Sequence, residues 1–203
     1  MAAKKKRARK RTAARDAPRL WVPKLGMFLL RVFTGALFVD AVYYKLWVTR
    51  MRAADPQAAD GGGLGLSLLD AFDHFVEHDY KPLVQHAAEN PPALFGRDLT
   101  WFSSFMENIM LPGAVPDLMG PAILVFELLL GFALILGLGV RLMGMLGAAL
   151  MLVFAMAKGT YFLGVTSTNW LLLFVLVALA LTAAGRLWGL DSRLQHRFPG
   201  WVS

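Results

Sequence analysis

The chain has 203 residues, 57% of them hydrophobic, and a mean hydropathy of +0.51, values typical of a membrane protein. It contains no cysteine, which excludes disulfides, iron–sulfur ligation, c-type haem attachment and thiol catalysis within this chain. The net charge of +7 is unevenly distributed, because residues 1–24 contain ten Lys or Arg whereas residues 49–117 contain four basic and ten acidic residues.

Residues 1–24 form a basic tail directly before the first apolar stretch. Positively charged segments beside a membrane span stay in the cytoplasm and are attracted to anionic lipid, so this tail is expected to bind lipid and not nucleic acid. The sequence therefore predicts a protein of the cell (inner, cytoplasmic) membrane with a cytoplasmic N-terminus. An even number of spans places the C-terminal tail, residues 187–203, on the same side.

Four apolar stretches predict membrane-spanning helices, at residues 25–48, 118–138, 142–159 and 169–186. A hydrocarbon core about 30 Å thick needs about 20 residues of helix, which each stretch approaches or exceeds. We therefore expect an all-α fold, an integral membrane four-helix bundle.

The segment between the first two spans, residues 49–117, is expected to form a partly helical extracytoplasmic loop domain. Ser67–His86 shows helical periodicity, and Asn90–Pro92 should end that helix. Leu99–Met110 is apolar but only about 12 residues long, so we expect it to lie in the outer interface or to cap the bundle. This acidic domain is a candidate docking surface for an extracytoplasmic partner.

Several polar residues lie in the outer half of the predicted spans. Counting from the span ends places Asp40 and Glu127 at similar depth, with Lys45, Lys158 and Asn169 in the same half of the bundle. An ionised side chain at membrane depth costs at least about 2.5–3.5 kcal/mol, so these groups must pair, reach water or serve the chemistry of the protein.

Two main interpretations of this polar region stay open. In the first, the charges form a structural network in which Lys45 neutralises Asp40 or Glu127. In the second, they line a pocket that opens outward, in which Glu127 and Asp40 exchange protons with a quinone-like or other small molecule. Candidate pocket-lining side chains are Tyr43, Tyr44 and Tyr161. A transport path is a third possibility.

Two arginines belong to the cytoplasmic side of the bundle. Arg31 is expected to extend to the interface or to pair with the inner end of the second span, and Arg141 lies in the short connection between the second and third spans. We assign both to the structural charge network.

A metal site is a weak possibility in the loop domain. On a helix, Asp70, His74 and His78 stand four residues apart and could present ligands along one stripe. The motif is incomplete, so no resident metal is expected.

Several of these residues carry a resemblance to a known family. Leu30-Arg31 with Gly35 and Lys45, and the run from Glu127 through Gly131 to Gly137 with Arg141 after it, resemble the first two helices of the DoxX-like family. Asn169, Gly185-Arg186 and Leu190-Asp191 resemble its ending. The resemblance covers residues 25–48 and 118–192. It implies a four-helix membrane protein related to the small subunit of thiosulfate:quinone oxidoreductase.

The resemblance implies an accessory or quinone-proximal subunit of a larger membrane-bound oxidoreductase, respiratory or quinone-linked. It has no redox metal or covalent cofactor of its own, is not expected to be catalytic alone, and would contact lipid, other subunits and a quinone or lipid ligand. The alternatives are a purely structural assembly subunit and a small stand-alone transporter.

Overall fold

The computed structural model describes residues 24–47, 68–94, 97–159, 168–182, 184–186 and 188–194. Three of its helices are long and apolar enough to cross a membrane: the first helix (Lys24–Trp47), α5 (Val115–Leu136) and α6 (Val140–Ala157). These bounds agree with the first three predicted spans to within three residues.

The fourth apolar helix, α7, is shorter than the sequence predicts. It runs over Thr168–Leu181, which is 14 residues, or about 21 Å of helix. The predicted span of residues 169–186 instead ends in a separate 3-10 turn, η3 (Ala184–Arg186), and the short helix α8 (Asp191–Leu194) follows.

The segment between the first helix and α5 is mainly helical where the structure describes it. It contains α2 (Leu68–Phe75), a π-helical turn η1 (Val76–Tyr80) and α3 (Lys81–Glu89), followed by a two-stranded antiparallel ribbon of β1 (Ala93–Leu94) and β2 (Arg97–Asp98). Then α4 (Thr100–Phe105) continues into a second π-helical turn, η2 (Met106–Met110). We call residues 68–110 the cap.

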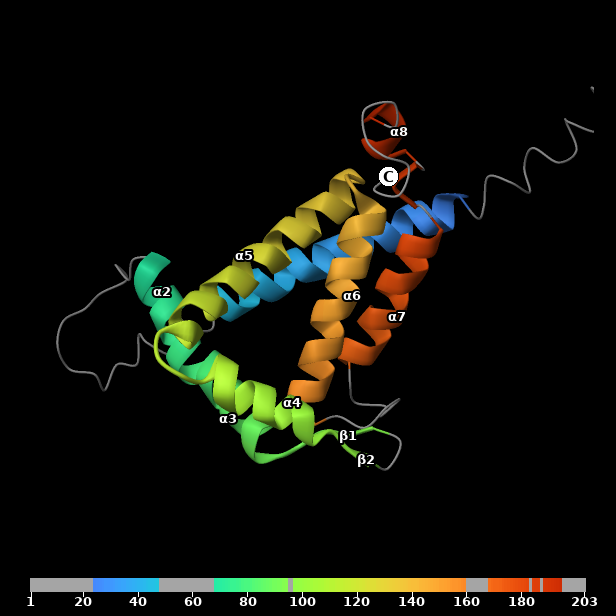
Figure 1. The fold of residues 1–203 in the computed structure, drawn as a ribbon. Coiled ribbons are helices and arrows are strands. Elements are labelled where there is room, and N and C mark those ends of the chain that lie inside the picture. The colour runs from blue at the N-terminus through green and yellow to red at the C-terminus, as the bar shows by residue number, and fades with distance from the viewer. Residues whose placement is uncertain are drawn as a thin grey trace, which may run out of the picture.

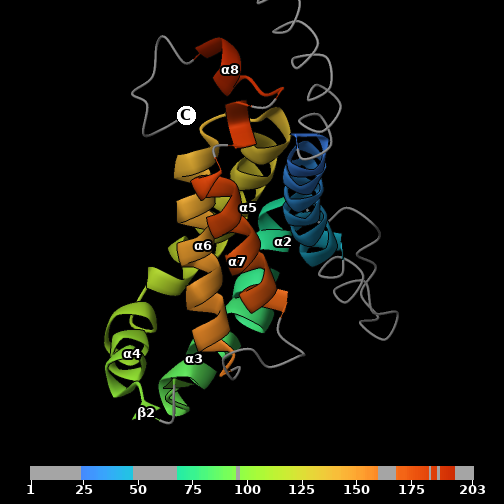
Figure 2. The same cartoon turned by 90° about the vertical axis from the view of Figure 1, so that its right-hand side faces the viewer.

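The cap closes one end of the bundle (Figure 1). From their shared turn at the far end, α5 and α6 diverge towards the cap, and α3 and α4 lie across the open end between them. Figure 2 shows α5, α6 and α7 side by side, with the first helix flanking them and α8 at the end opposite the cap. The bundle therefore has a capped end and an opposite end, where the α5–α6 turn and α8 meet.

Glycines allow the long helices to approach closely. A Cβ on Gly35 of the first helix would lie 2.6 Å from the carbonyl oxygen of Gly131 in α5, a distance that real Cβ atoms do not reach. On the other side of the bundle, a Cβ on Gly144 of α6 would lie 2.9 Å from the carbonyl oxygen of Leu176 in α7. Small residues at such crossings let backbones pack directly, which drives helix association in membranes.

The buried side chains form two clusters along the bundle. The cluster near the cap joins the first helix, the cap, α5 and α6 through residues such as Val42, Phe75 and Met156. The other joins all four long or apolar helices through residues such as Phe38, Leu134 and Leu176. The cap is thus packed onto the bundle by apolar side chains.

Polar contacts act both within the cap and between the cap and α5. Within the cap, Ser103 donates a hydrogen bond to the carbonyl oxygen of Ala87, joining α4 to α3 at 3.0 Å. Lys81 contacts Glu77 within the cap and Asp117 at the start of α5, the latter at 3.1 Å, and these two acceptors raise the pKa of its ammonium. Because this group is solvated, the ion pairs contribute little to stability.

Candidate functional site

A cavity of about 260 Å³ lies beneath the cap, between the cap and the helices of the bundle. Its walls come from the first helix, the α2–η1–α3 segment, α5, α6 and α7. Most of the lining is apolar, and the polar groups come from Lys45, Asp79, Tyr80, Glu127, Lys158, Thr168 and Asn169. The volume is slightly below the range of about 300–1,000 Å³ usual for ligand pockets, so it suits a small ring or headgroup.

The central polar feature of the cavity is an ion pair between two helices. Lys45 of the first helix donates to Oε2 of Glu127 in α5 at 2.5 Å, and the Glu127 side chain is only 3% exposed, whereas that of Lys45 is 29% exposed. Taking two charges out of water costs several kcal/mol per ion, and close pairing offsets this cost. Such a pair persists inside an apolar wall only because each ion neutralises the other.

Aromatic rings complete the surroundings of Lys45. Its Nζ lies 5.8 Å from the ring centroid of Phe75 and 5.5 Å from that of Phe154. A cation within about 6 Å of a ring centroid is attracted by the negative face of the ring. The ammonium therefore lies against one carboxylate and two aromatic rings at the wall of the cavity.

The π-helical turn of the cap supplies one wall. The Lys81 N–H bonds to the carbonyl oxygen of Val76, five residues back, which shifts the helical register by one residue. Asp79 and Tyr80 of this turn line the cavity, together with Phe75, the last residue of α2. Burial raises the pKa of the Tyr80 hydroxyl. Such turns occur often at functional sites, which supports the cavity as the site here.

Besides Glu127, three other residues that the sequence placed in the polar half of the bundle line the cavity. They are Lys45, Lys158 at the end of α6 and Asn169 at the start of α7. Lys158 is exposed, and Asn169 is half-buried. Two cations and two carboxylates (Glu127 and Asp79) thus border one cavity, a balance that suits a neutral ligand better than an anion.

Of the two partners that the sequence left open for Lys45, the structure has Glu127, and the alternative pairing with Asp40 is wrong. The residue is exposed and is absent from the cavity lining. Helical geometry explains this placement. At 100° per residue, Asp40 stands about 200° around the first helix from the buried Phe38.

The predicted tyrosine lining also differs from the structure. Tyr43 and Tyr44 are exposed, and neither lines the cavity. Tyr161 lies outside the described residues. The tyrosine that does line the cavity is Tyr80, from the cap.

Arg31 belongs to a separate polar cluster at the end opposite the cap. It is 1% exposed, and its Nη1 donates to the carbonyl oxygen of Ala184 at 2.8 Å. The expected extension to the interface is therefore wrong. Its guanidinium packs against Gly137, where a Cβ would lie 2.5 Å from Nη1, and it is electrostatically coupled to Asp191.

Asp191 organises this cluster. It is 1% exposed and accepts hydrogen bonds from the N–H groups of Gly139, at 2.7 Å, and Val140, at 3.1 Å, at the start of α6. A carboxylate at a helix N-terminus satisfies N–H groups that have no partner within the helix. Gly137 and Gly139 adopt φ of +69° and +57°, and thus form the tight turn between α5 and α6.

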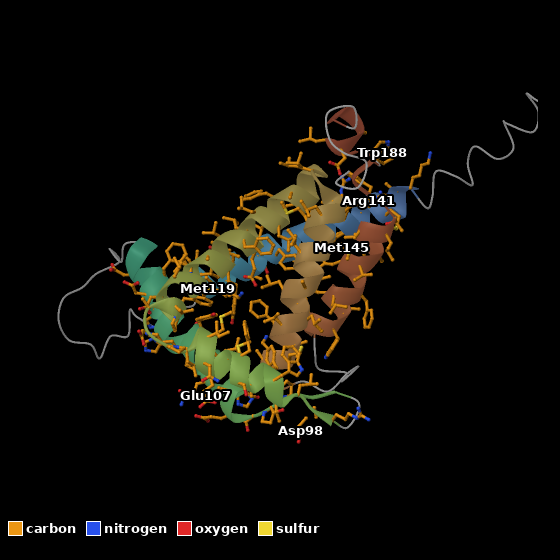
Figure 3. The ribbon with its side chains drawn as sticks, in the orientation of Figure 1. Asp98, Glu107, Met119, Arg141, Met145 and Trp188 are labelled. Atoms are coloured by element: carbon orange, nitrogen blue, oxygen red, sulfur yellow. The ribbon has the colours of Figure 1, made fainter. Side chains whose placement is uncertain are left out.

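Arg141 lies one residue further along α6, half-buried and far from the cavity. Figure 3 shows Arg141 and Trp188 at one end of the molecule and Glu107 and Asp98 at the other, on the cap. The predicted charge network is therefore two clusters, one at each end.

The weak metal candidates do not gather into a site. The rings of His74 and His78 stack with centroids 4.0 Å apart. His78 Nδ1 also lies 3.2 Å from the carbonyl oxygen of His74. Among the residues that the structure describes, no three His, Cys, Asp or Glu side chains are placed to hold a metal ion.

Sequence reasoning missed the cap's contribution to the site. Phe75, Asp79 and Tyr80 line the cavity only because the cap folds back over the bundle, and no span-based count of depth includes them. Asp191 follows the glycine-containing segment after the last apolar helix, and this position is the signal that could have drawn attention to it. Its partners could not be predicted, because they are backbone N–H groups of the α5–α6 turn.

The apolar helices and the capped polar cavity define a multi-pass membrane protein. Residues 87–164 match the family model described as DoxX, which supports the predicted DoxX-like family assignment. The match includes α4, α5 and α6, and with them Glu127, Arg141 and Lys158. It begins in the cap, which the sequence resemblance does not include. No curated protein and no solved structure matches the chain.

Proposed function

We propose that this DoxX-like protein is a quinone-proximal subunit of a larger membrane oxidoreductase, and that the cavity beneath the cap binds a quinone-type headgroup. The observation that carries this proposal is the buried Lys45–Glu127 pair in a mainly apolar cavity. A quinone headgroup is a neutral, apolar ring with carbonyl oxygens. The aromatic walls fit the ring, and the Lys45 ammonium, a hydrogen-bond donor that lines the cavity, fits a carbonyl oxygen.

The same pair suits proton exchange with such a ligand. The reduced form of a quinone carries hydroxyl groups, and its oxidation releases two protons and two electrons. In this proposal Glu127 accepts a proton from a hydroxyl group and passes it to Asp79 or to water at the cavity mouth. The electrons go to a redox centre on a partner subunit, because a cysteine-free chain has no thiolate ligand for one.

The proposal includes a membrane arrangement. We place both termini in the cytoplasm and the cap outside, on the evidence of the basic N-terminal tail. Since α7 packs along α6, it would complete a four-helix bundle in the cell membrane. Its 14 residues are short for a full span, so local thinning of the bilayer would accompany it. The acidic cap would then meet an extracytoplasmic partner.

The test uses the native complex, purified gently into lipid nanodiscs. Bound quinone is measured by extraction and mass spectrometry, and affinity is measured with a short-chain quinone probe. Lys45→Met should weaken probe binding by about tenfold or more, because a hydrogen bond from a charged group contributes about 1.5–3 kcal/mol. Glu127→Gln should keep binding but lower quinone-linked turnover.

Matched controls separate ligand effects from general damage. Ala41→Phe fills the cavity without changing a charge and should abolish probe binding, whereas Ala149→Phe, at an exposed position of α6, should not. Glu107→Gln, exposed on the cap, is the control for Glu127→Gln. The absence of bound quinone from the wild-type complex, with unchanged turnover in Glu127→Gln, would refute the proposal.

The alternatives give different results in the same assays. A structural assembly subunit predicts that Glu127→Gln lowers the yield of complex while the complex that forms keeps its turnover. A lipid ligand predicts extracted phospholipid in place of quinone. A stand-alone transporter predicts activity of the purified chain in liposomes without partners.

A further inference from the structure

The outward face of the first helix carries a regular stripe of exposed residues. Spacings of three or four residues place them on one side of the helix, opposite the buried stripe that contains Phe38 and Val42. The members of this outer stripe are Leu29, Phe33, Ala36, Asp40, Tyr44 and Trp47. Five of the six are apolar or aromatic, and the exception is Asp40.

Asp40 lies well inside the length of a membrane-spanning helix. It is seven residues from Trp47 and sixteen from Lys24, or about 10 Å and about 24 Å from the two ends. A carboxylate exposed to hydrocarbon at such depth is unfavourable, so acidic residues in spans face protein or water in nearly all cases. The stripe therefore needs a polar group against Asp40.

A second copy of this chain does not meet that need. Two first helices paired face to face about a two-fold axis would bring each stripe against itself and place two carboxylates at the same level. Like charges at close range repel, most strongly in a medium of low dielectric constant. The occupant of the stripe must instead carry a hydrogen-bond donor or a cation at the depth of Asp40.

We propose that the outer stripe docks a transmembrane helix of a different subunit, one that carries a Lys, Arg or His within its apolar run. The apolar members of the stripe pack against that helix, and the single acidic group fixes its register and its identity, as one polar residue does in a helical interface. The stacked pair of Tyr43 and Trp47 lies at the end of the stripe nearest the cap.

This inference rests on the proposal that the chain is part of a larger complex, but not on what the cavity binds. Leu37 borders the cavity and lies beside the stripe, so the docked helix would pass close to the cavity. Because the docking proposal does not depend on the identity of the cavity ligand, the measurement of bound quinone and the measurement of docking can succeed or fail separately.

The absence of cysteine makes a site-specific cross-linking test clean, because each introduced thiol is unique in the chain. Phe33→Cys and Ala36→Cys are labelled with a photoreactive benzophenone maleimide in native membranes and irradiated. Both should give one cross-linked product of the same mass. Leu129→Cys, exposed on α5, is the matched control and should give about tenfold less of that product.

The charge at position 40 should control the yield of the cross-linked product. Adding Asp40→Lys to either cysteine variant should lower its yield about tenfold. The cross-linked peptide, sequenced by mass spectrometry, should come from an apolar segment with a basic residue. Replacing that basic residue with Asp should restore cross-linking to the Asp40→Lys variant, which a merely misfolded protein would not do.

Three results would overturn the docking proposal. The first is a product with twice the 22.4 kDa mass of this chain. The second is a yield at Phe33→Cys no higher than at Leu129→Cys. The third is an Asp40→Cys thiol that reacts with a membrane-impermeant maleimide as fast as Asp98→Cys on the exposed cap, since Asp40 would then face water.

Discussion

The Lys45–Glu127 pair makes an asymmetric prediction about stability. Glu127 is 3% exposed, so in the Lys45→Met variant its carboxylate loses the neighbouring cation and cannot turn to water. An unpaired charge kept out of water costs several kcal/mol. Measured costs of breaking buried pairs are similar, at about 3–5 kcal/mol. We expect Lys45→Met to lower the free energy of unfolding by this amount.

The opposite truncation should cost less. Lys45 is 29% exposed, so in Glu127→Gln its ammonium can move towards water while the amide keeps a hydrogen-bond acceptor. We expect a loss of about 1–2 kcal/mol. The double variant buries neither charge and should resemble Glu127→Gln, so a double-mutant cycle should give a coupling energy equal to the Lys45→Met loss, about 3–5 kcal/mol.

The assay is reversible unfolding in mild detergent at neutral pH, followed by tryptophan fluorescence. Lys24→Met, exposed at the start of the same helix, is the control and should change stability by less than about 0.5 kcal/mol. Additive single-variant effects, or a Lys45→Met loss no greater than that of Lys24→Met, would refute the reasoning.

Three further predictions use the same unfolding assay. Gly35→Ala should lower the free energy of unfolding by about 1–3 kcal/mol, because the new Cβ would meet the backbone of α5. A Cβ at Gly26 would meet nothing within 4 Å, so Gly26→Ala should be neutral or slightly stabilising. Equal effects of the two substitutions would contradict the close crossing of the first helix and α5. Asp191→Ala should cost about 3–5 kcal/mol, because it removes two backbone hydrogen bonds and leaves a buried arginine without its acidic neighbour, and exposed Asp98→Ala should cost less than about 0.5 kcal/mol. Burial raises the pKa of Tyr80 above its ordinary value of 10.0, so above about pH 10 the unfolded chain releases this proton while the folded chain keeps it, and stability should fall as the pH rises. Tyr80→Phe should lack this part of the alkaline decline, and an identical pH dependence in both proteins would show that Tyr80 is not buried.

The sequence by itself determined the class of protein and most of its elements. Hydropathy alone located the first helix, α5 and α6, because a membrane-crossing helix must be long and apolar whatever it packs against. Helical periodicity and a proline-flanked stop located the cap helices. Lys45, Glu127, Lys158 and Asn169 were placed in one half of the bundle by counting residues at a constant rise, and all four line the cavity.

Only the tertiary structure decided which acidic residue lies inside. Asp40 and Glu127 are equivalent by depth, but the crossing of the first helix and α5 at Gly35 and Gly131 fixes the rotation of the first helix. That rotation turns Lys45 towards Glu127 and Asp40 away from it, because five residues of helix separate two side chains by about 140°. Depth follows from position in the chain, whereas the inward face depends on where two distant backbones can touch.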